Sequence, residues 1–134
     1  MKLLLDTHIL LWSLYGNGDI PKDVWHMIGD TSNDVYYSTA SIWEITIKHM
    51  AKPEKMLLSG TELAEKCNTV GFQMLAITDN HVGYLETLCR KTNAKPHNDP
   101  FDRIMIAQAK AEKMTFITHD SLMSSYEEPC ILPI

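Results

Sequence analysis

Residues 1–12 read MKLLLDTHILLW, and this stretch decides the fold class. The leucines at 3–5 are consecutive, which predicts a short strand buried on both faces, because a half-exposed strand alternates apolar and polar residues. The segment 7–15 that follows has the length and apolar content of a helix. A buried strand that passes straight into a helix favours a parallel sheet built from β-α-β units.

The alternation of apolar runs and helical segments continues to the end of the chain. Strands are expected at 3–5, 35–38, 73–77, 115–118 and 130–133, and helices near 7–15, 21–30, 40–52, 60–70, 79–92 and 100–113. Such spacing implies right-handed crossovers, so we predict an α/β fold, a three-layer α/β/α domain with a central, mostly parallel sheet of about five strands. Pro133 places the last strand at an edge. Residues 1–134 contain no linker or repeat and are expected to form a single domain.

The composition is that of an ordinary globular protein. Hydrophobic residues make up 45% and charged residues 22% of the chain, which argues against disorder. No apolar run approaches the roughly 20 residues that a membrane span requires. Asp6 and His8 interrupt the first apolar run and no small-residue cleavage site follows, so a signal peptide is not predicted. We expect a cytoplasmic protein with no membrane contact and with reduced cysteines.

Four acidic residues stand where strands end or helices begin. Asp6 follows the first strand directly, and Asp120 follows the strand at 115–118. Glu44 lies in the first turns of the helix after the second strand, and Asp102 lies in the first turn of the last long helix. Open parallel sheets bind ligands beyond the carboxyl ends of their strands. The four side chains are therefore expected to converge in one crevice there.

Each acid taken alone also has a purely structural explanation. Each can be a helix cap or a member of a capping box, the latter as the pairs Ser41–Glu44 and Asp99–Asp102. Helix capping does not explain why all four acids gather in one crevice, because several ionised carboxylates there repel one another and lose hydration. A cation makes that arrangement tolerable, and ligands that are all oxygen favour Mg²⁺ or Mn²⁺ over zinc.

Four motifs together resemble the PIN-domain ribonucleases, specifically the VapC-like toxins of bacterial toxin–antitoxin pairs. The motifs are MKLLLDTHILLW, STASIWEITIKH, HNDPFDRIMIAQA and ITHD, and the resemblance extends over nearly the whole chain. The block DPFDR with its following AQA is the most specific part. The resemblance implies that Asp6, Glu44, Asp102 and Asp120 form the metal site of a single PIN-like domain.

The same resemblance implies an activity and partners. The implied activity is metal-dependent hydrolysis of RNA phosphodiester bonds by an endoribonuclease that uses one or two Mg²⁺ or Mn²⁺ ions. Asp6 and Asp102 are the expected direct ligands, while Glu44 and Asp120 bind directly or through water. The implied partners are the RNA substrate, a small antitoxin that places a basic side chain among the acids, as in a VapBC-type pair, and a second copy of the chain in a homodimer.

Other polar residues are candidates for supporting roles. Thr7 and Thr118 flank the acids and are expected to hydrogen-bond carboxylates or waters of the metal site, or else backbone groups. Lys48, Lys52 and Arg103 are candidate RNA contacts, and a solvated helix face or local ion pairs are the alternative explanation.

The remaining charged and titratable residues limit how RNA can be bound. The net charge is −5, and removing the four acids from the 17 acidic residues leaves 13 against 12 Lys and Arg. No broad basic face is available, so phosphate affinity must depend on the metal and on local patches. The six histidines show no ligand spacing, so His97 and His119 are interpreted as surface or packing residues, and Asp99 is interpreted as a helix cap.

Two other classes of protein remain open. A phosphoaspartyl phosphatase or receiver domain also carries an aspartate after the first strand, but the phosphatase pattern needs a second aspartate where this chain has His8, and a receiver's acidic pair is not evident. An acyl phosphate formed at Asp6 would identify this class. The second alternative is a non-catalytic PIN-fold module, which would bind RNA or a protein without cutting RNA.

Overall fold

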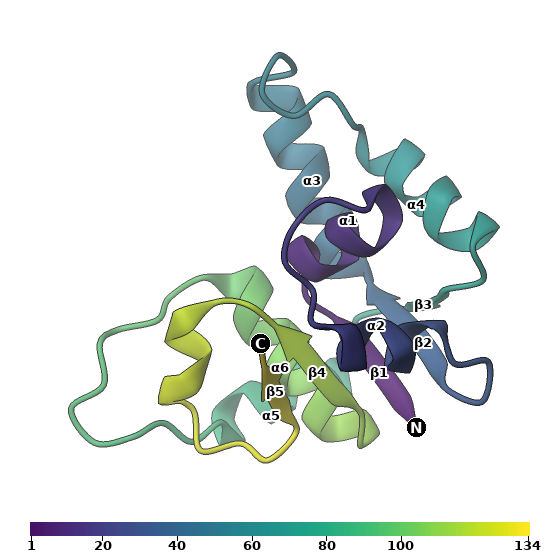
Figure 1. Ribbon diagram of the computed structural model, residues 1–134. Helices are drawn as coiled ribbons and strands as arrows, with labels where there is room; N and C mark the ends of the chain where they lie inside the picture. Colours follow the sequence, from purple (N-terminus) through teal and green to yellow (C-terminus); the bar gives the residue numbers. More distant parts are fainter.

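The computed structural model describes all 134 residues, and a parallel sheet of five strands lies at its centre (Figure 1). Across the sheet the strands follow the order β3 (Gln73–Leu75), β2 (Asp34–Ser38), β1 (Lys2–Leu5), β4 (Thr115–Thr118) and β5 (Ile131–Pro133). All adjacent strands are parallel, and helices cover both faces. The predicted three-layer fold is confirmed, and so is the edge position of the strand that ends in Pro133.

Six α-helices and two short 3-10 helices connect the strands. They are α1 (Thr7–Tyr15), α2 (Lys22–Gly29), α3 (Thr39–Ala51), α4 (Gly60–Thr69), α5 (Asp79–Tyr84), η1 (Leu85–Thr87), α6 (Pro100–Glu112) and η2 (Ser121–Ser125). The helices predicted near 7–15, 21–30, 40–52, 60–70 and 100–113 are confirmed, and their ends differ from the prediction by at most one residue. None of the helices is long and apolar enough to cross a bilayer.

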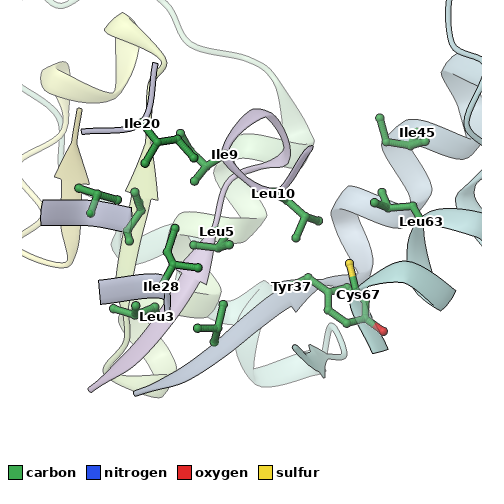
Figure 2. Close-up of a cluster of buried hydrophobic side chains, with 13 residues drawn as sticks. Leu3, Leu5, Ile9, Leu10, Ile20, Ile28, Tyr37, Ile45, Leu63 and Cys67 are labelled. Carbon is green, nitrogen blue, oxygen red and sulfur yellow. The ribbon is translucent and has the colours of Figure 1, made fainter. Parts of the chain in front are cut away.

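The larger core lies on the face of the sheet to which Leu3 and Leu5 point (Figure 2). Their side chains are completely buried with residues of α1, α2, α3 and α4, among them Ile9 and Leu10 of α1. Full burial of a leucine or isoleucine side chain contributes about 1.5–3 kcal/mol. This packing fixes α1 against the sheet immediately after β1, and so it fixes the residue between them, Asp6.

The second core lies on the opposite face, to which Leu4 points because successive strand side chains alternate. It is formed with Phe116 of β4, with Met105 and Ile106 of α6, and with Tyr126, which follows η2. All of these side chains are at most 6% exposed. The prediction that the first strand is buried on both faces is therefore confirmed.

Two local predictions were wrong. The helix expected near 79–92 ends at Tyr84 and continues only as the short η1, because the chain then turns extended and pairs with the segment after η2. The isolated antiparallel bridge between Arg90 and Tyr126 marks this pairing, and two backbone hydrogen bonds of 2.8 Å flank it. The strand predicted at 73–77 ends at Leu75 and is an edge strand whose side chains are exposed or half-buried.

Three elements begin directly at the carboxyl ends of neighbouring strands. Asp6 follows β1 and caps α1, Ser38 ends β2 and caps α3, and Asp120 caps η2 two residues after β4. In Figure 1 the strands β1, β2 and β4 run side by side into these elements. Because all three strands are parallel, the caps lie along one edge of the sheet, which is where the candidate site is built.

Candidate metal centre

Asp6 is the most deeply buried acid of the site, with 4% of its surface exposed. Its Oδ1 accepts a hydrogen bond from the Thr7 backbone N–H at 2.7 Å, and its Oδ2 accepts one from the Thr118 hydroxyl at 2.5 Å. Burial raises the pKa of Asp6, while the hydrogen bonds from Thr118 and Thr7 act in the opposite direction. The two donors hold the carboxylate in one orientation between β1 and β4.

Glu44 reaches the site from the second turn of α3. Its Oε1 accepts a hydrogen bond from the Thr7 hydroxyl at 2.8 Å, and its Oε2 lies 2.9 Å from Nζ of Lys48. The Ser41–Glu44 capping box is wrong, because α3 begins at Thr39 and Ser38 is its cap. The carboxylate of Glu44 consequently does not cap the helix.

Asp102 lies in the first turn of α6. The predicted cap Asp99 is confirmed, because its side chain accepts from the backbone N–H groups of Phe101 and Asp102. Oδ2 of the Asp102 carboxylate lies 3.1 Å from Nε2 of His97. Burial and then the charges of neighbouring acids, Asp6 first, raise the pKa of Asp102 to about 8.

Asp120 completes the set and is connected to Asp6 through one threonine. Its Oδ1 accepts from the Leu122 backbone N–H at 2.9 Å, and its own backbone N–H donates to the Thr118 hydroxyl oxygen at 3.2 Å. The same hydroxyl donates to Asp6. Thr118, which is fully buried at the end of β4, therefore contacts both the Asp6 carboxylate and the Asp120 backbone.

The four acids line one pocket of about 370 Å³. The complete lining is polar and consists of Asp6, Thr7, His8, Glu44, Lys48, Asp99, Asp102, His119 and Asp120. The acids come from four separate segments of the chain, which only the parallel sheet brings to one place.

The chain also matches a family model. The model is that of the PIN domain, and it matches residues 3–129. The chain belongs to the PIN-domain family. No curated protein matches the sequence.

Solved structures with the same fold are distant in sequence. VapBC2 from Rickettsia felis bound to a promoter DNA fragment has a TM-score of 0.67 at 14% identity, over 100% of this chain and 98% of the other. DNA-bound VapBC from Salmonella typhimurium has a TM-score of 0.66 at 15% identity, over 99% and 98% of the two chains. FitAB bound to a DNA fragment has a TM-score of 0.55 at 21% identity, over 98% and 93%. At these identities the likeness supports the PIN fold.

The other predicted site residues of this PIN domain lie at different distances from the acids. Lys48 lines the acidic pocket, while Lys52 lines a neighbouring hollow of about 320 Å³ with Lys48 and Lys55. Arg103 does not line the pocket, and it donates from Nη1 to the Tyr126 hydroxyl at 3.1 Å. Contacts of these residues with RNA stay predictions.

Sequence reasoning missed the place of His97. It is buried, as a packing histidine would be, but its Nε2 also reaches Asp102, and one ligand atom each of His97, Asp102 and Asp120 lie within 4.8 Å of one another. Burial lowers the pKa of His97, with the charge of Asp120 acting against it. The only signal in the sequence was its position two residues before Asp99, within the HNDPFDR motif.

The donor set of the PIN domain fits a hard divalent cation. Carboxylate oxygens surround the pocket, and no thiol lines it. Burial raises the pKa of Asp6 and, with the charges of neighbouring acids, raises that of Asp102 to about 8, so full ionisation of the pocket is unfavourable without a compensating charge. A divalent ion would provide that compensation and keep the carboxylates ionised.

Proposed function

We propose that this PIN domain is a Mg²⁺- or Mn²⁺-dependent endoribonuclease and the toxin of a VapBC-type toxin–antitoxin pair in the cytoplasm. One observation carries the proposal: carboxylates from four separate segments surround a single pocket, and burial, together with the charges of the neighbouring acids, raises the pKa of Asp102 to about 8. Such a cluster is costly to fold and has an evident use only when a cation binds in it.

The proposed ligand roles are those that the resemblance to the PIN-domain ribonucleases implies. Asp6 and Asp102 would hold the ion directly, and Glu44 and Asp120 directly or through water. When bound, the ion would activate a water for attack on phosphorus and stabilise the charge on the phosphate and the leaving oxygen. Thr118 would hold Asp6 and Thr7 would hold Glu44, because the hydroxyl of each already donates to that carboxylate.

The RNA backbone would approach along α3. Lys48 stands at the rim of the pocket, paired with Glu44 and with its side chain 48% exposed, so its ammonium can turn to a phosphate. Lys52 lies four residues further on, at the C-cap of α3. These lysines would offset phosphate repulsion from the acids.

An antitoxin partner and a homodimer belong to the same proposal. Trp43, Ile47 and Met50 recur on one face of α3 and are 57%, 46% and 76% exposed, an apolar surface beside the acidic pocket. A partner covering it could place a guanidinium among the carboxylates, where one group satisfies several acceptors. Solved structures with this fold include VapBC2 from Rickettsia felis and VapBC from Salmonella typhimurium, which supports a protein partner.

The deciding experiment is cleavage of total bacterial RNA by the purified protein, free of any partner. Reactions would contain Mg²⁺, Mn²⁺ or chelator, and the cut ends would be mapped. Asp102→Asn tests the site, and Asp23→Asn is the matched control, because Asp23 is an exposed aspartate of α2 outside the pocket. We expect discrete cuts that need metal, that Asp23→Asn retains and that Asp102→Asn loses.

Other results would refute the proposal. Cuts that persist in chelator, or in folded Asp102→Asn protein, would exclude the acidic pocket as the catalytic site. Wild-type protein that binds RNA and Mn²⁺ but leaves all RNA intact would instead identify a binding module. A monomer in sedimentation at micromolar concentration would exclude the homodimer without affecting the nuclease.

A further inference from the structure

A row of three side chains stands behind Asp102, outside the acidic pocket. Nε2 of His97 lies 3.1 Å from Oδ2 of Asp102, and Nδ1 of His97 lies 2.7 Å from the Tyr126 hydroxyl. Arg103 donates from Nη1 to the same hydroxyl at 3.1 Å. None of the three residues lines the pocket, yet the row ends on one of its carboxylates.

The direction of each hydrogen bond follows from the chemistry of the groups. A carboxylate that holds a cation can only accept, so Nε2 of His97 must donate to Asp102, and the neutral ring then accepts at Nδ1. The Tyr126 hydroxyl supplies that proton, which leaves its oxygen to accept from Arg103. Every donor in the row has an acceptor, and hydrogen bonds arranged in one direction strengthen one another.

Tyr126 gives this row a rigid anchor. Its ring is 6% exposed and belongs to the second core, where it meets the His97 ring edge-on at 5.5 Å and the Arg90 guanidinium at 5.1 Å. Tyr126 also follows η2, the helix that Asp120 caps. The contact between His97 and Tyr126 therefore connects the segment that carries Asp102 to the segment that carries Asp120.

We propose that His97 and Tyr126 are positioning residues for the metal site, with the Nε2–H of His97 fixing the Asp102 carboxylate and the Tyr126 hydroxyl fixing the His97 ring. The inference rests on the proposed function, because it gives Asp102 the role of a metal ligand. Groups that orient a ligand in this way typically contribute 10–100-fold to metal affinity. His97 itself stays outside the ligand set.

The test measures Mn²⁺ affinity by electron paramagnetic resonance titration, without RNA. His97→Ala should bind Mn²⁺ at least ~10-fold more weakly, and His97→Gln should recover part of the loss because its amide can still donate to Asp102. Tyr126→Phe keeps the buried ring and removes only the hydroxyl, and it should weaken binding several-fold. Tyr37→Phe is the matched control, since it removes a buried hydroxyl that donates to Asn68 instead, and it should bind Mn²⁺ normally.

A second readout separates positioning from simple packing. In the Mg²⁺-loaded protein, nitrogen-15 spectra should place the single imidazole proton of His97 on Nε2, with the signal assigned by its loss in His97→Gln. A proton on Nδ1 would overturn the proposal, and so would strong nitrogen-14 coupling to bound Mn²⁺ that disappears in His97→Gln, because His97 would then be a ligand.

The remaining outcomes are equally decisive. Unchanged Mn²⁺ affinity in both folded His97→Ala and Tyr126→Phe would overturn the inference, and unchanged affinity in Tyr126→Phe alone would overturn the role of the tyrosine. Wild-type protein that binds no Mn²⁺ would overturn the metal site together with this inference. Wild-type protein that binds Mn²⁺ but cuts no RNA would refute the nuclease, and the comparison of variants would still decide the role of His97.

Discussion

The replacement Asp102→Asn should stabilise the metal-free protein, and the gain should grow with pH. The pKa of Asp102 is raised from 3.8 to about 8 in the folded protein. Between these two values the folded state keeps a proton that the unfolded state has released, so stability falls as pH rises from about 4 through about 8. An asparagine has no proton to release, and the variant escapes this loss.

The magnitude follows from the size of the shift. One unit of pKa corresponds to about 1.4 kcal/mol. Integrated from about pH 5 to about pH 8, the loss assigned to Asp102 is ~3.5 kcal/mol. Its side chain is 14% exposed, and local relaxation of the pocket reduces the effect, so we expect the variant to gain about 2–3 kcal/mol over wild type across this range.

Urea unfolding of both proteins in chelator, at several pH values between about 5 and 8, would measure this difference. The lowered pKa of His97 acts in the opposite direction in the wild-type protein. Saturating Mn²⁺ should then stabilise wild type more than the variant. A stability difference that is the same at both ends of the pH range would refute the reasoning.

Three further predictions concern other parts of the molecule. Thr118→Val removes the hydroxyl that donates to Asp6, and we expect ~10-fold weaker Mn²⁺ binding and a loss of about 1–3 kcal/mol in the free energy of unfolding. Metal titration and urea unfolding would measure the two effects. Values equal to those of the wild type in both assays would contradict the role of the hydroxyl. The double variant Lys48→Gln with Lys52→Gln should bind RNA with a weaker salt dependence. The slope of log K against log salt concentration should become shallower by roughly 0.7 for each phosphate contact that is lost, and an unchanged slope would show that these lysines do not contact RNA. Burial raises the pKa of Cys67 to about 12, so its thiol should resist iodoacetamide at neutral pH until the protein unfolds, as mass spectrometry would show; rapid labelling of the folded protein would contradict its burial.

Local signals in the sequence were sufficient for much of the fold. The consecutive leucines at 3–5 predicted a strand buried on both faces, and Asp99 followed by Pro100 predicted the start of α6. The extended segment after η1 was not predictable in this way, because residues 88–92 contain no glycine or proline. That segment leaves the helix to pair with the chain after η2, which is a tertiary interaction between distant residues.

In the candidate site, too, some residues could be identified from local sequence, whereas others depend on tertiary contacts. Acids that directly follow strands can be identified from sequence, because a parallel sheet brings all its carboxyl ends to one edge. The hydrogen bond between His97 and Tyr126 joins residues 29 positions apart, and it depends on where η2 places its last turn. The side chain of Trp43 also illustrates the limit: it stands among apolar neighbours in the sequence but is more exposed than buried in the fold.

Two of the four acids cap helices in addition to lining the pocket, and this affects how relatives of this chain should be compared. Asp6 and Asp120 each accept backbone hydrogen bonds at the start of a helix, so evolution would retain them for folding even in a descendant that had lost its enzymatic activity. Glu44 caps nothing, and an ionised Asp102 costs stability. A lineage that no longer cuts RNA would thus be expected to lose these two acids first, and their presence or absence is the better marker of an active enzyme.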